Sequence, residues 1–281
     1  MATLECEIPE GLSDTLQQRA HATGEDTSRF VTRILQRALA KSTHTLFQIS
    51  TSRALVQGVY EEAVSAGQLL LHGDFGLGTF DALDGEMVLL DGVIYQVKSD
   101  GTVHRVQDDA GTPFATVLHF SDDDESVLTN LISFGDLCDL CDEHRRSQNV
   151  FYAFRVDGRF SRIRTRAMPR TQDGISLKTA AESQPEFSFN DVEGTLVGFW
   201  SPPYVSAVGI PGYHFHFLSK DRSKGGHVLD CAGNELLLKV EMIKEFHLAL
   251  PDNEAFLRAD LTADVSKALS AAEGNHSEKK A

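Results

Sequence analysis

Three histidines lie close together in the second half of the chain. His214 and His216 are separated by a single residue, and His227 follows His216 by eleven residues. In a β-strand, residues i and i+2 point to the same face, so a strand here would place His214 and His216 side by side. The Gly225-Gly226 pair favours a turn that would bring His227 to the same point. Three neutral imidazoles with one open coordination position are a common arrangement for catalytic zinc. The alternative is two strand histidines and an unrelated loop histidine.

The composition is that of an ordinary globular protein. Of its 281 residues, 41% are hydrophobic and 24% are charged, and the net charge is −15. This charge argues against broad contact with nucleic acid or an anionic membrane, both of which attract basic surfaces. No apolar run reaches the length of a membrane span, and the first residues lack the features of a signal peptide. The four cysteines form no dense disulfide framework, so we expect a cytoplasmic protein.

A second candidate metal motif is Cys138-Asp-Leu-Cys141, with His144 close by. A structural zinc site normally needs four ligands, and the sequence offers no second cysteine pair. We therefore predict a helix here on which Leu137, Leu140 and Cys141 pack.

Residues 1–42 are predicted to form a unit of their own. Apolar and polar residues alternate over residues 3–8, as in a short strand. A helix is expected to open after Pro9 and to stop near Gly24, and Asp26 and its neighbours offer caps for a second helix. The alternative is a helical extension packed on the main domain.

This order of strand, helix and helix resembles a ribbon-helix-helix module, a family in which two chains pair their strands. The resemblance implies a homodimer or a larger oligomer. In that family the paired ribbon enters DNA, but Glu5 and Glu7 on this strand would be repelled by phosphate. We therefore favour dimerisation over DNA binding for the unit. The alternative is a metabolite-sensing transcriptional regulator that uses the unit to bind DNA.

From about residue 45 the pattern is rich in strands separated by short turns. Strands are expected at residues 45–50, 86–90, 93–97, 102–106, 195–200 and 235–240, and helices at 52–67, 127–145 and 253–257. Residues 150–166 are expected to form a hairpin that turns at Asp157-Gly158, and residues 122–125 a charged loop or helix start. Residues 73–78 are expected to form a glycine-rich loop. Their glycines lack the Gly-x-Gly-x-x-Gly order, so a dinucleotide site is not expected.

Three segments together resemble acetolactate decarboxylase: residues 73–86, residues 151–166, and residues 194–230 with the three histidines at the family's spacing. The similarity extends over about residues 45–275, and we assign residues 45–281 to this domain. It implies an α+β, β-rich fold in two parts, a mixed sheet with helices and a small C-terminal β-barrel, preceded by the strand-helix-helix unit. The sequence departs from the family at Gly209, where Asn is usual, and in the loop after Arg170.

The resemblance also implies the site. His214, His216 and His227 match the zinc ligands, Glu86 the active-site glutamate and Arg166 the active-site arginine, and Thr79 lies beside them. In that family a second active-site glutamate comes from the C-terminal tail of the protein. In this chain Glu273 is the best match to it, and Glu254 is the fallback.

The implied reaction converts 2-acetolactate to acetoin and CO2, and 2-acetohydroxybutyrate is a possible second substrate. Zinc would stabilise the negative charge that develops when CO2 leaves, and a glutamic acid would protonate the resulting enediolate. Burial or a second carboxylate would keep that glutamic acid protonated. Arg166 would bind the carboxylate or neutralise the enediolate. No organic cofactor is needed, and a different zinc lyase or hydrolase on the same scaffold remains an alternative.

Overall fold

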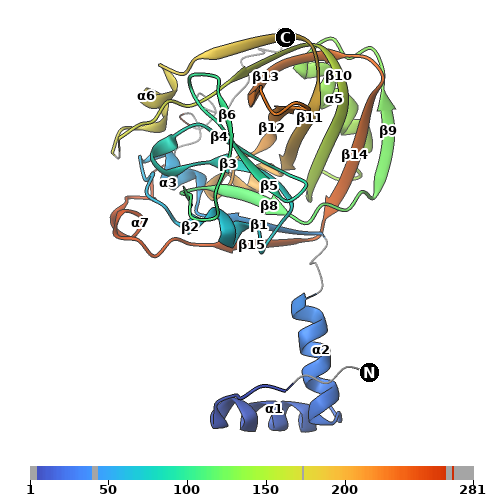
Figure 1. Cartoon of the computed structure of the whole chain (residues 1–281), viewed down its shortest axis with the longest axis vertical. Coiled ribbons are helices and arrows are strands. Elements are labelled where there is room, and N and C mark those ends of the chain that lie inside the picture. The colour runs from blue at the N-terminus through green and yellow to red at the C-terminus, as the bar shows by residue number, and fades with distance from the viewer. Residues whose placement is uncertain (1–4, 40–43, 173, 264–267, 269–281) are drawn as a thin grey trace. The chain divides into compact units, whose positions relative to one another are not determined.

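The computed structural model describes residues 5–39, 44–172, 174–263 and 268. The chain divides into two compact units, Met1–Ser42 and Thr43–Ala281. Figure 1 shows the first as a pair of helices and the second as a β-rich body.

The first unit consists of α1 (Glu10–Ala22) and α2 (Thr27–Leu39), which pack on each other. Both predicted helices are confirmed. Gly24 follows α1 with φ +73°, and the Asp26 carboxylate caps α2 by accepting from Arg29 N–H at 2.9 Å. Residues 5–8 are irregular in the single chain, so the predicted strand and its pairing with a second chain stay a prediction. A strand needs a hydrogen-bonded neighbour, and no described segment of this chain pairs with these residues.

The second unit contains a seven-stranded sheet in the order β15-β1-β8-β3-β4-β5-β6. Only β1 and β15 pair in parallel and the other neighbours are antiparallel, so the sheet is mixed, as expected. The strands are β1 (Thr45–Ile49), β3 (Phe75–Thr79), β4 (Glu86–Leu90), β5 (Val93–Val97), β6 (Val103–Arg105), β8 (Ala115–Leu118) and β15 (Glu245–Ala249). Strands β2 (Val64–Ser65) and β7 (Gly111–Thr112) form a separate two-stranded sheet.

A six-stranded sheet forms the other part of this unit. Its strands are β9 (Asp124–Leu128), β10 (Phe151–Arg166), β11 (Glu186–Ser201), β12 (Gly212–Ser219), β13 (Gly225–Gly233) and β14 (Leu236–Ile243). Strand β10 pairs with β11, β11 with β12, β12 with β13, and β13 again with β10, so these pairings return to the starting strand. The expected barrel stays a prediction.

Short helices complete the second unit: α3 (Ser52–Val56), α4 (Ala66–Leu69), α5 (Phe134–His144), α6 (Leu177–Ala181), α7 (Glu254–Arg258), and the 3-10 turns η1 (Asp81–Leu83) and η2 (Pro203–Ala207). The predicted helix at 52–67 is wrong beyond Val56, and the one at 127–145 begins only at Phe134, after a Ser133 cap. Leu137 and Cys141 are buried on α5, and Cys138 and Leu140 pack against the same core, so the structural prediction for this helix is confirmed.

Two other local predictions are wrong. Residues 75–79 form the buried strand β3 rather than a loop, because Gly76 and Gly78 let β8 approach closely: a Cβ on Gly78 would lie 2.4 Å from Phe114 O. Strand β10 continues through Asp157-Gly158 without a turn. There the Asp157 carboxylate accepts from Arg155 and Thr195 inside the sheet. A third prediction is wrong in part: the charge run at 122–125 was expected to be a loop or helix start, but Asp124 and Glu125 begin β9.

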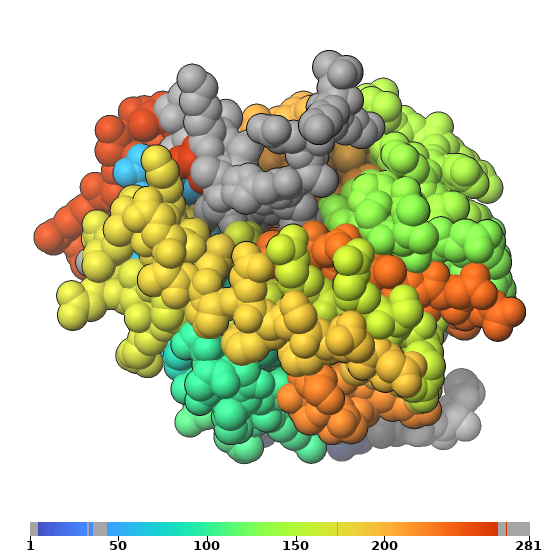
Figure 2. Space-filling view, turned by 90° about the horizontal axis from the view of Figure 1, so that it is seen from above, coloured from blue at the N-terminus to red at the C-terminus, as the bar shows by residue number. Residues whose placement is uncertain are grey.

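The two sheets share a core. One apolar cluster combines Leu46, Phe75 and Val88 of the seven-stranded sheet with Val197 and Phe199 of β11. Figure 2 shows one outer face of this body, where the gold segment of β11 runs above teal residues near 100 and orange residues near 220. Strand β4 contacts β12 and β13, which carry the histidines, and β3 contacts β11.

Candidate metal centre and pocket

The three histidines lie in one pocket between the two sheets. Its polar lining consists of Thr79, Glu86, Arg166, His214, His216 and His227, and its other lining residues are Leu55, Gly78, Leu83, Phe114, Met168, Leu177 and Ile210. The pocket is a small cavity of about 30 Å³, enough for one or two water molecules. The sequence-predicted polar residues that the structure describes therefore converge, apart from Glu254.

Strands β12 and β13 bring the imidazoles together. His216 and His227 are direct neighbours across the antiparallel pair, and His214 lies two residues before His216 on the same strand. The His214 Nε2 atom is 3.1 Å from His216 Nε2 and 3.0 Å from His227 Nδ1. Ligand nitrogens about 2.0–2.1 Å from a tetrahedral zinc lie about 3.3 Å from one another. The donor set therefore fits a zinc ion at these three nitrogens.

The predicted role of the glycine pair is wrong. Gly225 and Gly226 belong to β13, and the chain reverses before them, over residues 220–224. Both glycines instead allow the backbone of neighbouring strands to approach closely. A Cβ on Gly225 would lie 2.7 Å from Phe217 O, and one on Gly226, whose φ is +125°, would lie 2.5 Å from Arg166 O.

Desolvation keeps His214 and His227 neutral. Desolvation, with a smaller effect of the Arg166 charge, lowers the pKa of His214 to about 3 and lowers the pKa of His227 well below its ordinary value. The His216 Nδ1 atom is 2.7 Å from the carbonyl oxygen of Met87, to which it can only donate. In the neutral imidazole this bond places the proton on Nδ1 and leaves the Nε2 lone pair toward the pocket. The carbonyl group is a backbone partner of the kind that orients metal-binding histidines.

Glu86 and Thr79 are direct neighbours across β4 and β3. The Glu86 side chain is 8% exposed. Its Oε1 atom accepts from Met168 N–H at 3.0 Å, and its Oε2 atom is 3.5 Å from His216 Nε2. The Thr79 hydroxyl donates to Gly85 O at 2.8 Å, directly before Glu86. One carboxylate oxygen of Glu86 is thus held by the backbone, while the other faces the histidines.

The turn before Glu86 has an unusual backbone. Ala82 and Leu83 have φ values of 57° and 53°, and Gly85 has a φ of +90°. Two consecutive non-glycine residues with positive φ carry strain that the surroundings must hold. Here Ala82 N–H donates to Tyr60 O at 3.0 Å, and Ala82 O accepts from Thr171 N–H at 2.7 Å. The turn places Leu83 and Glu86 in the same pocket.

Arg166 ends β10, where it is the direct neighbour of His227 on β13 and is 6% exposed. Its guanidinium contributes to the lowered pKa values of both His214 and His227, so its positive charge acts on the histidine cluster. Arg162 and Arg164 on the same strand are instead about half exposed and pair with Asp230 and Glu186.

The two proposed tail glutamates differ. Glu273 lies outside the described residues. Glu254 begins α7, where its side chain is 74% exposed and pairs with Arg258 at 2.7 Å, and it is not among the described residues that line the pocket.

The apolar side of the pocket was not predicted from the sequence. Leu55, Phe114, Leu177 and Ile210 come from four separate segments, and each resembles any other core residue in the sequence. The backbone partners of Glu86 and His216 were also missed, because no residue type marks a functional N–H or carbonyl group.

Residues 46–263 match the sequence profile of the family described as alpha-acetolactate decarboxylase. The chain belongs to the alpha-acetolactate decarboxylase family. An alpha-acetolactate decarboxylase of Methanosarcina mazei is 42% identical over 80% of this chain and 78% of its own length, and one of Methylococcus capsulatus is 42% identical over 84% and 91%. The crystal structure of alpha-acetolactate decarboxylase from Bacillus subtilis matches with a TM-score of 0.79 at 33% identity, over 82% of this chain and 99% of that one.

The α+β, β-rich fold expected from the resemblance is therefore that of this family. The match covers the second unit and leaves the first unit outside it. Among the described residues, no helix has the length and apolar character needed to cross a membrane.

Proposed function

We propose that the chain catalyses the decarboxylation of 2-acetolactate to acetoin and CO2 with zinc at His214, His216 and His227. The observation that carries this proposal is the meeting of three imidazoles with a buried glutamate and a buried arginine in one small pocket. When bound, zinc supplies a Lewis acid that stabilises negative charge on the substrate oxygens. In this scheme residues 45–281 form the catalytic domain.

Glu86 is the proton donor in this scheme. Its Oε1 atom is occupied by Met168 N–H, so Oε2 is the atom that faces the histidines and would hold the proton. Such a donor requires the neutral carboxylic acid. Arg166 is the neighbour of His227 across β10 and β13 and lines the same pocket, where its guanidinium would bind the substrate carboxylate by two parallel hydrogen bonds.

Glu273 is proposed as a second carboxylate over the pocket. The support is Ala268, which packs against the apolar cluster that includes Leu55, Met168 and Leu177 of the pocket wall. Five residues span at most about 18 Å, so Glu273 is within reach of the pocket from Ala268. Two carboxylates sharing a site raise the pKa of one of them, which would help to keep a proton donor neutral.

Acetoin formation from racemic 2-acetolactate tests the reaction. The purified protein is assayed as isolated, after removal of metal with a chelator, and after return of zinc. We expect activity to disappear with the chelator and to return with zinc. Bound zinc without any acetoin would keep the metal site but refute the substrate.

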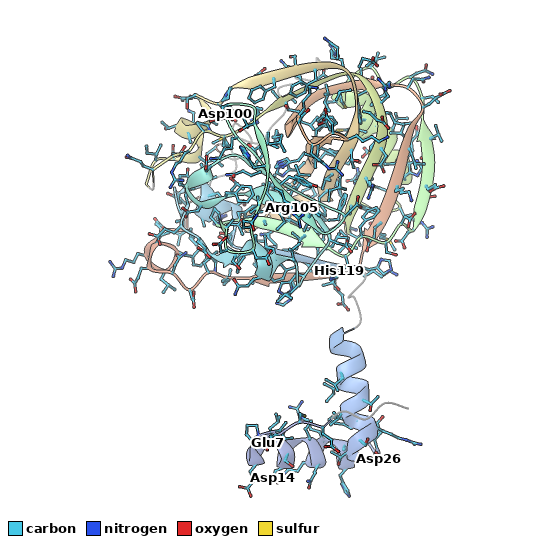
Figure 3. The ribbon with its side chains drawn as sticks, viewed as in Figure 1. Glu7, Asp14, Asp26, Asp100, Arg105 and His119 are labelled. Atoms are coloured by element: carbon cyan, nitrogen blue, oxygen red, sulfur yellow. The ribbon has the colours of Figure 1, made fainter. Side chains whose placement is uncertain are left out.

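We further propose that the first unit associates with a second copy of the chain. Its described apolar side chains include only two that are buried, Ala20 and Phe30, whereas Leu12, Ile34 and Leu35 are 39–47% exposed. A unit of this size rarely folds on so small a core without further burial. Its exposed carboxylates, including Glu7 and Asp14 in Figure 3, do not suit DNA.

Sedimentation of the full chain tests this association. We expect a dimer or larger species for the natural chain and a shift toward the monomer for Leu35→Glu, which places a charge in the exposed apolar face of α2. The matched control is Ile132→Glu, because Ile132 is 70% exposed in the second unit. An unchanged mass for Leu35→Glu would refute the role of the first unit.

A further inference from the structure

A buried polar cluster outside the pocket joins β1 to the segment that leads into β12. Gln48 and Ser52 are 4% and 0% exposed. The Gln48 Nε2 atom donates to Ser50 O and to Val208 O, both at 2.8 Å. Ser52 donates from its hydroxyl to Gly209 O at 2.7 Å and from its N–H to Val208 O at 2.9 Å. These four hydrogen bonds form a polar bridge.

Each end of the polar bridge is followed by an apolar residue of the pocket. Leu55 comes three residues after Ser52 in α3, and Ile210 comes directly after Gly209. The bonded segments are about 160 residues apart in the sequence, so the bridge determines where these two walls lie relative to each other. Buried polar groups are costly when unpaired, which makes the bridge resist displacement.

The segment around Gly209 has little free space. A Cβ at this position would lie 3.3 Å from Val205 Cγ2 and 3.5 Å from Gln48 Oε1. A displacement of Gln48 would therefore be passed to the segment that ends in Ile210, because densely packed interiors transmit small shifts.

We propose that Gln48 and Ser52 are positioning residues that fix the separation of Leu55 and Ile210 and so set the size of the alkyl group that the pocket accepts. The inference rests on the proposed function, in which the substrate is a 2-hydroxy-2-alkyl-3-oxo acid. The oxygens of such an acid face the histidines, Glu86 and Arg166, and its alkyl group faces the apolar side. One methylene in an apolar pocket changes discrimination by about 10–200-fold, so a small shift of either wall is measurable.

The test compares the methyl and ethyl substrates, 2-acetolactate and 2-acetohydroxybutyrate, in Ser52→Ala and Gln48→Met. We expect the ratio of their kcat/KM values to move toward the ethyl substrate by about 3–10-fold in both variants, because the walls are no longer held together. The control is Thr195→Val, which removes a buried hydroxyl that donates to Asp157 Oδ1 at 2.6 Å outside the described lining of the pocket. Its ratio should stay within about twofold of the natural chain.

An equal loss of kcat/KM for both substrates, with an unchanged ratio, would show that the bridge only supports the fold and would overturn the proposal. So would a shift of the same size in Thr195→Val. If Ser52→Ala and Gln48→Met do not fold, Gly209→Ala supplies the test, since it keeps all four donors but adds a methyl group against Val205 and Gln48. An unchanged ratio in Gly209→Ala would also overturn the proposal.

A second readout separates this inference from the proposed reaction. The reduced analogues 2,3-dihydroxy-2-methylbutanoate and 2-ethyl-2,3-dihydroxybutanoate lack the ketone and cannot lose CO2 by this route. Their Kd values for the zinc-loaded protein are measured by calorimetry. A shift in the ratio of these two Kd values in the bridge variants supports the inference even if neither keto acid is turned over. Absence of turnover would refute only the proposed reaction. No binding of either analogue to the natural chain would overturn both.

Discussion

The hairpin of β12 and β13 has a polar cluster at each end, and the two clusters differ in burial. At the pocket end the three histidines lie between the sheets, with two of their nitrogen–nitrogen distances at 3.0–3.1 Å. At the other end the chain turns around Asp221, whose carboxylate accepts from Ser219 Oγ and from Ser223 N–H and Oγ. Asp221 and Ser223 are exposed to water.

Burial decides which protonation state each cluster keeps. Desolvation lowers the pKa of His214 to about 3, so this half-buried imidazole stays neutral and keeps a lone pair for a metal. Hydrogen bonds from Ser219 and Ser223 lower the pKa of Asp221 to about 2, so the exposed carboxylate stays charged and orders its own turn. The buried end can support chemistry, whereas the exposed end stabilises local structure.

The largest effect is expected for His216→Ala at the buried end. Removal of one of three ligands should abolish stoichiometric zinc binding and lower kcat/KM by at least about 10³-fold. Metal analysis and the acetoin assay measure the two losses. The control is His104→Ala, since His104 is an exposed residue of β6 that contacts Thr102. Full activity of His216→Ala without bound metal would contradict the site.

Glu86→Gln should lower kcat by about 10²–10⁴-fold, the usual contribution of a general acid or base, without loss of zinc. The amide keeps an oxygen for Met168 N–H but cannot deliver a proton as a carboxylic acid does. The comparison is Glu254→Gln, because the exposed side chain of Glu254 pairs with Arg258. A larger loss for Glu254→Gln than for Glu86→Gln would reassign the proton donor.

Arg166→Lys should lower kcat/KM by about 10–100-fold, because lysine keeps the charge but not the two parallel donors of a guanidinium. Arg164→Lys is the matched control on the same strand, where the arginine is about half exposed and pairs with Glu186 at 3.4 Å. Steady-state kinetics of both variants decide the question. Equal kinetics for the two variants would leave Arg166 without a role in substrate binding.

The smallest effect is expected for Asp221→Asn at the exposed turn. We expect activity within twofold of the natural chain and a melting temperature lower by about 3 °C or less at pH 7. Since the pKa of Asp221 is lowered in the folded state, its stabilisation is complete above its ordinary value of 3.8 and is lost as the pH falls toward 2. The difference in melting temperature should therefore shrink at pH 3. A difference that grows at pH 3 would contradict the assigned cause.

The sequence by itself predicted what depends on neighbouring residues. The helices α1, α2 and α7 and the strands β1, β4, β5 and β6 follow local periodicity and caps, and all were predicted. The alternation of His214 and His216 on a strand is equally local. Asp157-Gly158 has the residues of a turn and forms none, because β10 is hydrogen-bonded to β11 and β14 at this point and the ladder overrides the local preference.

Only the tertiary structure decided how the pocket is assembled. The resemblance of three segments selected Thr79, Glu86 and Arg166, but it could not show that Met168 N–H holds Glu86 or that Met87 O orients His216. These partners are backbone groups from segments about 80 and 130 residues away in the chain. Every residue carries the same backbone donor and acceptor, so the sequence cannot distinguish them until the chain folds.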